Sequence, residues 1–468
     1  MQQIVTNQTY SRRWAALAVL CTAQFLVIMD TSIIGVALPA IKESLGYTQA
    51  GLQWIFNAYV IAFGGLLLLG GKLSDIFGPR KIFMTGFVVL TAASLLAGAA
   101  WSEATLNIGR ALQGAGSALI APSALTLVMS MFTDPRELGK ALGFWGASAA
   151  AGGSAGVFLG GIITEWMSWR WVFLINIPVG LYVLSVSKAY LLQGVKQRGI
   201  VNVRSAVMIT LALTVMVYAI VSAEQSGWMS GTVAGLLAAA VVLLVVFIRS
   251  QRSSREPLLP LGIFRAPNLA AGNIVMGLMA AAWIPLWFFL NLYLQQVLQY
   301  SAFRSGLALL PMTLAIMLIM VGFTGKLVQR FGFKKNLVAG LLFLTFSLVV
   351  FSTVSVGGGF LASVLIPSLL GAVGMSLAYI PGTIASMSGA KPEETGLASG
   401  IVNTSYQIGS AIGLAVIVVL VAATTQNSLS EGVQHVEALN NGFRTGFIAA
   451  AVVSAVATLV AIFRIRKG

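Results

Sequence analysis

The chain has 468 residues, of which 58% are hydrophobic and only 9% are charged, and its formal net charge is +15. A soluble domain is typically about 25% charged, so this composition excludes a soluble globular protein. It predicts an all-α polytopic membrane protein, because apolar stretches repeatedly reach the ~20 residues that a helix needs to cross a bilayer core.

Fourteen apolar stretches follow one another along the chain. We place these predicted spans at 14–36, 51–70, 82–101, 104–131, 140–164, 171–192, 204–223, 229–248, 269–296, 304–325, 336–353, 359–386, 395–423 and 443–463. The short alternating strands of an outer-membrane barrel are absent from the sequence. Connections between the spans are short, so the sequence predicts no separate soluble domain.

Lysine and arginine are distributed unequally between the two sides of the predicted spans. With the N-terminus placed inside, 23 of the 28 basic residues fall inside and four fall outside, whereas Arg110 lies within a span. This positive-inside pattern predicts that both termini are cytoplasmic. The basic charge therefore indicates a lipid bilayer as partner and not a nucleic acid.

The first span contains Asp30, the one acid that lies deep in a predicted span. A carboxylate near mid-membrane costs several kcal/mol unless it is paired, hydrated or protonated, which makes it a functional candidate. Arg110 lies in the fourth span. At ~1.5 Å per residue, both residues are expected about 10 Å below the outer surface of the bilayer core, where they can be neighbours.

Two interpretations of Asp30 and Arg110 stay open. A permanent buried ion pair would hold helices together, whereas in a proton switch Arg110 keeps Asp30 ionised until substrate or a conformational change separates them. Isolated intramembrane charges usually mark ion pathways, so we favour proton coupling by this pair.

An internal repeat predicts the architecture. The segment GKLSDIFGPRK at 71–81 recurs as GKLVQRFGFKK at 325–335, and by the span assignment this shift corresponds to eight helices. The simplest arrangement is six spans, two inserted spans and six spans, with parallel halves related by an axis along the membrane normal. We expect an N-terminal bundle at 1–193, two linker helices at 194–250 and a C-terminal bundle at 251–468.

Spans 5 and 13 correspond under this repeat, and glycines recur in both at four-residue spacing. Such spacing places a flat strip on one helix face and permits close backbone approach. The strip is either ordinary packing inside one half or a sliding seam between the halves. The candidate seam residues are Gly152, Gly156, Gly160, Gly396 and Gly400.

With these segments identified, the chain resembles the major facilitator superfamily, specifically its fourteen-span drug:proton antiporters. The resemblance covers nearly the whole chain. It rests on an Asp-Thr followed by Ala-Leu-Pro in span 1 (Asp30, Thr31 and 37–39), on LNIGRALQGAGSA at 106–118 and on WRWVFLINIPVG at 169–180. In span 5 the family's Gly-Pro pair is replaced here by Gly156 and Val157.

The loop motif of this family matches Gly71, Asp75, Gly78, Arg80 and Lys81. We expect Asp75 and Arg80 in a short cytoplasmic turn, where the basic residues need no explanation beyond the positive-inside rule. Asp75 adds nothing to topology and could dock onto a helix N-terminus. The resemblance implies a gate latch that stabilises the outward-facing state, and in the repeat Gln329 stands at the place of Asp75.

Polar and aromatic residues on apolar faces are candidates for a substrate cavity with few charges. For any single amide, an interhelical hydrogen bond worth ~0.6 kcal/mol is the simpler interpretation. Two tryptophans one helical turn apart could stack on an aromatic or cationic substrate, although lipid-facing packing fits them equally well. The candidates are Gln24, Asn57, Gln113, Trp283, Trp287, Asn291, Asn403 and Gln407.

The leading hypothesis is a bacterial-type exporter of amphipathic drugs or toxic compounds in the cytoplasmic membrane, driven by proton entry and working by alternating access as a monomer. One alternative is a transporter for one defined metabolite, such as an amino acid or a secondary metabolite. A remote alternative is a non-transporting receptor. With one cysteine, Cys21, and one histidine, His435, the sequence excludes a metal cluster and a Ser-His-Asp triad in the membrane, so we expect neither an enzyme nor a cofactor beyond the proton.

Overall fold

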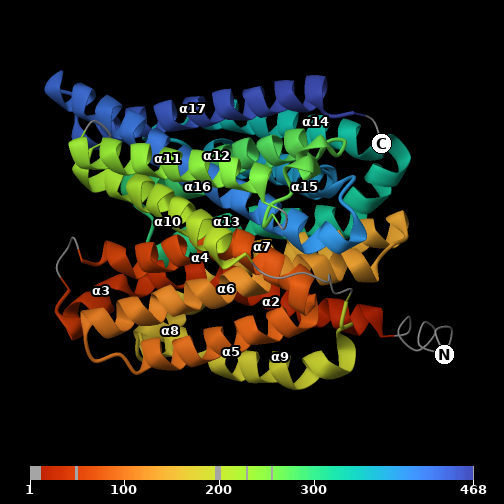
Figure 1. The fold of residues 1–468 in the computed structure, drawn as a ribbon. Coiled ribbons are helices and arrows are strands. Elements are labelled where there is room, and N and C mark those ends of the chain that lie inside the picture. The colour runs from red at the N-terminus through yellow and green to blue at the C-terminus, as the bar shows by residue number, and fades with distance from the viewer. Residues whose placement is uncertain (1–11, 48–50, 195–201, 228–229, 255–256, 467–468) are drawn as a thin grey trace, which may run out of the picture. The chain divides into compact units, whose positions relative to one another are not determined.

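The computed structural model describes residues 12–47, 51–194, 202–227, 230–254 and 257–466, and these residues are helical with no strand among them (Figure 1). The first helices are α2 (Arg13–Ser32), α3 (Ile34–Leu45), α4 (Gln53–Phe77), α5 (Pro79–Gly98), α6 (Glu103–Met131), α7 (Pro135–Trp166), α8 (Trp171–Leu174), α9 (Asn176–Tyr190), α10 (Val203–Ser226) and α11 (Gly231–Ser253). There follow η1 (Leu261–Arg265), α12 (Leu269–Leu292), η2 (Tyr293–Val297), α13 (Ala302–Ile319), η3 (Met320–Thr324), α14 (Gly325–Phe351), η4 (Leu361–Leu365), α15 (Ile366–Met387), η5 (Pro392–Glu394), α16 (Thr395–Ser430) and α17 (His435–Arg464).

Among the described residues, 12 helical segments are long and apolar enough to cross a membrane. One of them, 304–351, has 48 residues and merges two spans that the sequence analysis separates. Its helical course is interrupted at Gly332, whose backbone is non-helical (φ 79°, ψ 161°). A shorter apolar helix lies at Arg204–Ile220. The chain is therefore a multi-pass helical membrane protein.

Contacts between Cα atoms divide the chain into two units. Unit 1 comprises residues 1–219, 234–263 and 390–404, and unit 2 comprises 220–233, 264–389 and 405–468. The start of α16 thus clusters with unit 1, although it lies in the C-terminal part of the sequence. The expected boundary near residue 194 is followed by 195–201, which lie outside the described residues, and the division into 1–193, 194–250 and 251–468 stays a prediction.

The repeated segments have the same local structure. Gly78, between α4 and α5, has φ 92° and ψ 136°, which resembles the backbone of Gly332. A positive φ is readily adopted only by glycine, which explains why both copies carry one. In unit 1, Arg80 donates from Nη1 to the carbonyl of Leu191 at 3.1 Å. In unit 2, Lys334 donates from Nζ to the carbonyl of Ile462 at 2.7 Å.

Each of these cations therefore binds carbonyl groups at the C-terminal end of a neighbouring helix, where the helix dipole favours positive charge. In unit 1 the neighbour of α5 is α9, and in unit 2 the neighbour of α14 is α17 (Figure 1).

The glycine strip of α7 packs against α2 inside unit 1. A Cβ atom at Gly152 would meet the carbonyl of Phe25, and one at Gly160 would meet the carbonyl of Ile33. A Cβ atom at Gly156 would meet the carbonyl of Met29. These contacts favour the first of the two interpretations for the three glycines, which is tight packing within one half of the chain.

Gly396 and Gly400, at the start of α16, contact a different helix of unit 1. A Cβ atom at Gly396 would meet the carbonyl of Gly71 and the carboxylate of Asp75, and one at Gly400 would meet the carbonyl of Leu67. These two glycines thus permit the close approach of α16 to α4, which positions the contact of Asp75 described below.

Candidate functional site

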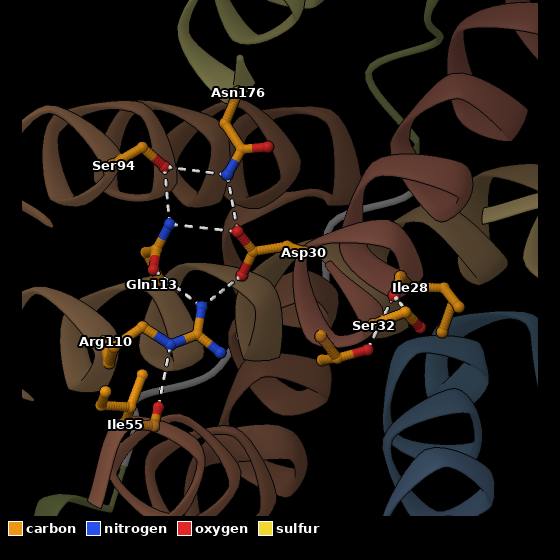
Figure 2. Close-up of polar contacts among 9 residues, drawn as sticks. Ile28, Asp30, Ser32, Ile55, Ser94, Arg110, Gln113 and Asn176 are labelled. Atoms are coloured by element: carbon orange, nitrogen blue, oxygen red, sulfur yellow. Dashed lines mark hydrogen bonds and ion pairs between the residues drawn. The ribbon is translucent and has the colours of Figure 1, made fainter. Parts of the chain in front are cut away.

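Asp30 lies in the last turn of helix α2, which ends at Ser32. The hydroxyl groups of Thr31 and Ser32 donate to the carbonyl of Ile28 at 2.7 and 3.1 Å (Figure 2). Side-chain bonds of this kind compete with the backbone ladder and often bend helices. Ile33, between α2 and α3, keeps helical backbone angles (φ −67°, ψ −29°), and its N–H bonds to the carbonyl of Met29. The first predicted span therefore continues as helix from α2 into α3.

Asp30 and Arg110 form a buried ion pair in unit 1. Arg110 Nη1 lies 2.7 Å from Asp30 Oδ2, and both side chains are 0% exposed. Arg110 also donates from Nε to the carbonyl of Ile55 at 3.0 Å. Its guanidinium carbon lies 4.5 Å from the centre of the Tyr59 ring, within the range of a cation–π interaction. The contact expected from the depth of the two residues is confirmed.

Two amide side chains hold the other oxygen of the carboxylate. Asp30 Oδ1 accepts from Asn176 Nδ2 at 2.6 Å and from Gln113 Nε2 at 3.2 Å (Figure 2). The same two amide nitrogens donate to Ser94 Oγ, at 3.2 and 2.8 Å. Gln113 also accepts from Arg110 Nη1 at 2.9 Å.

We call these five residues, Asp30, Ser94, Arg110, Gln113 and Asn176, the Asp30 network. They come from α2, α5, α6 and α9, and none is more than 1% exposed. Every oxygen of the carboxylate has a donor, so the ionised form of Asp30 is satisfied within protein. Two buried polar atoms, Arg110 Nη2 and Asn176 Oδ1, have no hydrogen-bond partner among the described residues. The carboxylate of Asp30 is thus fully hydrogen-bonded, whereas, in the described part of the chain, one nitrogen of Arg110 and one oxygen of Asn176 are not.

Ser94 and Asn176 were not predicted as site residues. Asn176 follows the apolar stretch WVFLI in the segment at 169–180, so an isolated amide in an apolar span was the available signal. Ser94 had no such signal, since small hydroxyl residues are common in membrane helices. Gln113, which was predicted to line a cavity, lies in the Asp30 network.

Asp75 lies in the last turn of α4 and not in the connecting turn, which corrects the sequence-based expectation. The helix continues through Phe77 because no helix-breaking residue precedes Gly78. The Asp75 side chain is 5% exposed. Its Oδ1 accepts from the backbone N–H of Gly396 at 2.7 Å, and its Oδ2 accepts from that of Leu397 at 2.8 Å.

The carboxylate of Asp75 thus binds the first turn of α16, where unpaired N–H groups and the helix dipole favour an anion. The other residues of the loop motif have separate contacts. Gly71 lies against Gly396, Gly78 turns the chain into α5, and Arg80 binds the end of α9.

The remaining cavity candidates lie on several helices. In unit 1, Gln24 is buried on α2 and Asn57 is half-buried on α4. In unit 2, the rings of Trp283 and Trp287 meet edge to face with their centroids 6.3 Å apart, and Asn291 accepts from Gln295 at 3.0 Å.

On α16, the side chain of Asn403 donates to the carbonyl of Ser399 in its own helix at 2.9 Å, and Gln407 follows one turn later. A joint substrate cavity formed by these residues stays a prediction.

The structure is that of a multi-pass helical membrane protein with a buried ion pair, and comparisons with known proteins show its class. Residues 20–414 match the family model described as Major Facilitator Superfamily. The chain belongs to this superfamily, and it is a transporter and not an enzyme.

Two curated relatives cover most of the chain. It is 37% identical to the cephamycin export protein CmcT of Amycolatopsis lactamdurans, over 92% of this chain and 89% of the relative. It is 36% identical to the puromycin resistance protein pur8 of Streptomyces alboniger, over 87% of this chain and 81% of the relative. These relatives fit the resemblance to the drug:proton antiporters.

Among solved structures, the proton:xylose symporter XylE bound to 6-bromo-6-deoxy-D-glucose matches with a TM-score of 0.69. The match covers 98% of this chain and 96% of that one at 12% identity, which shows a shared fold.

Proposed function

We propose that this protein is a proton-coupled antiporter that exports amphipathic drugs or antibiotics across a bacterial cytoplasmic membrane by alternating access. The substrate class is supported by the relatives, which are named for cephamycin export and puromycin resistance. The observation that carries proton coupling is the Asp30 network, a single acid with a cationic partner, fully buried in the last turn of α2.

The network supplies a physical route from protonation to conformational change. A proton on Asp30 removes the negative charge that holds the guanidinium of Arg110 at 2.7 Å. The buried cation then needs other partners, because an unpaired buried charge is strongly unfavourable. The carbonyl of Ile55 and the ring of Tyr59, both on α4, already contact it. Protonation would thereby shift the balance between α2 and α4 as partners of α6.

Asp75 serves as a latch in this proposal. Its two hydrogen bonds to the first turn of α16 stabilise one arrangement of α4 and α16, which we assign to the outward-facing state. The latch has one copy, because Gln329 occupies the repeated position and an amide lacks the charge that the helix dipole favours.

The proposed topology has fourteen spans arranged as six, two and six, with both termini cytoplasmic. The 48-residue segment 304–351 supports two crossings, since at ~1.5 Å per residue it is about twice the length that the ~30 Å core requires. Helix α10, of which Arg204–Ile220 is the apolar part, supports one more. We expect the transporter to act as a monomer and to need no cofactor beyond the proton.

The second candidate is export of one defined secondary metabolite. It is favoured by the names of the relatives, several of which specify a single antibiotic, such as tetracenomycin C in a 34% identical protein of Streptomyces glaucescens. A 30% identical relative is instead named a multidrug resistance protein. Both candidates require the same coupling residue.

The test is transport in proteoliposomes under an imposed pH gradient. The wild type should accumulate labelled amphiphiles or antibiotics against a concentration gradient, whereas Asp30→Asn, which cannot titrate, should only equilibrate them. Uptake by Ser187→Ala, a buried change on α9 away from the network, should match the wild type. Full gradient-driven accumulation by Asp30→Asn would exclude proton coupling at this residue. The range of accepted compounds separates the two candidates.

A further inference from the structure

A groove on unit 1 has no part in the proposed transport cycle. It is a cavity of about 530 Å³ formed where the end of α4, the start of α5 and the end of α9 meet. We call it the α5–α9 groove. Its principal lining residues are Phe77, Arg80, Lys81, Met84, Val88 and Lys188.

The mouth of the groove is strongly basic. Three of its lining residues are cations and none is an acid. The Lys81 ammonium lies 5.6 Å from the centre of the Phe77 ring, and both Lys81 and Lys188 are exposed. The third cation, Arg80, donates two hydrogen bonds from Nη1 to backbone carbonyls at the end of α9. Their acceptors are Lys188 at 3.4 Å and Leu191 at 3.1 Å. The two lysines therefore face the groove without an acidic partner in its lining.

The wall below the mouth is apolar. Met84 and Val88 follow Lys81 at three and seven residues along α5, so all three share one helix face. Val88 is 54% exposed and forms the end of this face within the groove. Since α5 crosses the membrane from its basic end, the face leads from the headgroup region into the hydrocarbon core. The groove thus places basic side chains at the headgroup level and apolar side chains toward the hydrocarbon core. This is the order in which a phospholipid carries its phosphate and its acyl chains.

We propose that the α5–α9 groove binds one anionic phospholipid, with its phosphate between Lys81 and Lys188 and an acyl chain along Met84 and Val88. A cation near the membrane surface attracts anionic lipid with modest energy, and several around one cavity bind a headgroup. The positive-inside rule alone would spread basic residues without a cavity between them. The proposal requires only that the chain lies in a membrane, so it is independent of the proposed substrate and of proton coupling.

The experiment measures lipid binding to the purified full-length protein in detergent by native mass spectrometry, titrating phosphatidylglycerol or phosphatidylcholine. The wild type should retain one phosphatidylglycerol in preference to phosphatidylcholine. Neutralising both lysines, Lys81→Gln with Lys188→Gln, should weaken phosphatidylglycerol binding on the order of 30-fold. Thr85 also lines the groove, so Thr85→Trp should fill it without changing its charge. This variant should also abolish the preference for phosphatidylglycerol.

A matched control comes from the internal repeat. Lys335 is exposed and occupies the repeated position of Lys81, so Lys335→Gln removes in unit 2 the same single charge that Lys81→Gln alone removes in the groove. It should leave phosphatidylglycerol binding unchanged. An equal loss in Lys335→Gln, unaltered binding in Thr85→Trp, or equal retention of phosphatidylcholine would each overturn the proposal. Displacement of the lipid by millimolar glycerol phosphate would also overturn it, because an acyl chain would then contribute nothing.

Discussion

Both oxygens of the Asp30 carboxylate accept hydrogen bonds, and this is how a charged group is accommodated with 0% exposure in a membrane span. Removing one partner of a buried ion pair typically costs 3–5 kcal/mol, whereas the intact pair adds little stability. The amides of Gln113 and Asn176 therefore matter as much as Arg110, since they supply the hydrogen bonds that complete the desolvated carboxylate.

At the residue scale we predict the effect of Asn176→Ala. The change removes the 2.6 Å hydrogen bond to Asp30 Oδ1, and a hydrogen bond to a charged group contributes about 1.5–3 kcal/mol. The desolvated carboxylate loses that stabilisation, and its hydrogen bonding beside Arg110 is left incomplete. Gradient-driven uptake in proteoliposomes should therefore fall at least about tenfold.

The same assay on Ser187→Ala provides the control, because Ser187 lies on the same helix and its hydroxyl bonds only to the carbonyl of Val183 among the described contacts. An uptake rate in Asn176→Ala equal to that of the wild type would mean that this hydrogen bond is not needed for transport.

At the scale of helices, the contact between α4 and α16 depends on one carboxylate and three glycines. Gly71, Gly396 and Gly400 bring the two backbones together, and Asp75 then reaches two N–H groups of the first turn. Ser399 adds a hydrogen bond to the carbonyl of Pro122 on α6 at 3.0 Å. The start of α16 is thereby fixed to α4 and α6 within unit 1.

We predict that Asp75→Asn loosens this contact. The amide keeps one acceptor but loses the charge, and charge-assisted hydrogen bonds are about twice as strong as neutral ones. The equilibrium constant for the arrangement in which α4 contacts α16 should therefore fall roughly tenfold. The measurement is thiol labelling of Ser399→Cys, a buried near-isosteric probe, in a Cys21→Ala background. Labelling should be several-fold faster in Asp75→Asn.

The matched control is Asp134→Asn, which alters an acid that caps a different helix, α7, through the backbone N–H of Arg136 at 2.8 Å. It should not change the labelling of Ser399→Cys. Equal rates with and without Asp75→Asn would show that the glycine packing alone holds α16.

Helix α10 also has defined neighbours. Gly65 on α4 lies so close to Thr214 on α10 that an added Cβ atom would collide with its hydroxyl. The rings of Trp54 and Tyr218 stack with centroids 5.8 Å apart. Gln251 on α11 donates to Ser205 on α10 at 3.0 Å. Residues 203–219 of α10 are thus held against α4 and α11 by specific contacts within unit 1.

At the scale of the whole molecule, the two copies of the repeat share local structure but not acidic residues. Gly78 and Gly332 share a backbone conformation, and Arg80 and Lys334 each bind the end of a helix. The acidic residues Asp30 and Asp75 have no counterpart in the second copy. We therefore expect the N-terminal half to handle the proton and the C-terminal half to contribute uncharged contacts.

The proposed topology predicts the outcome of reporter fusions. Alkaline phosphatase, which is active only outside the cytoplasm, should be active when fused after Gly227, between α10 and α11, and after Gly432, between α16 and α17. A fluorescent protein at the C-terminus should fluoresce in the cytoplasm. An inactive fusion at Gly227 together with an active one at Gly432 would mean that α10 and α11 do not both cross the membrane.

The sequence by itself determined the class of protein, the family and the pairing of Asp30 with Arg110. Hydropathy and charge are properties of single residues, and the fixed rise of a helix converts positions in the chain into depths in a membrane. The repeat and its glycines are likewise evident in the order of residues alone, because each copy carries the same residue types at the same spacing.

Only the tertiary structure decided which neutral side chains complete the site and where Asp75 binds. Ser94 and Asn176 reach Asp30 because α5 and α9 pack beside α2 and α6. A single polar residue in an apolar span does not indicate which helices will pack around it. Asp75 meets backbone N–H groups more than 300 residues away, 321 positions for Gly396. Backbone groups are identical at every residue, so a partner of this kind has no sequence signal and is found by geometry alone.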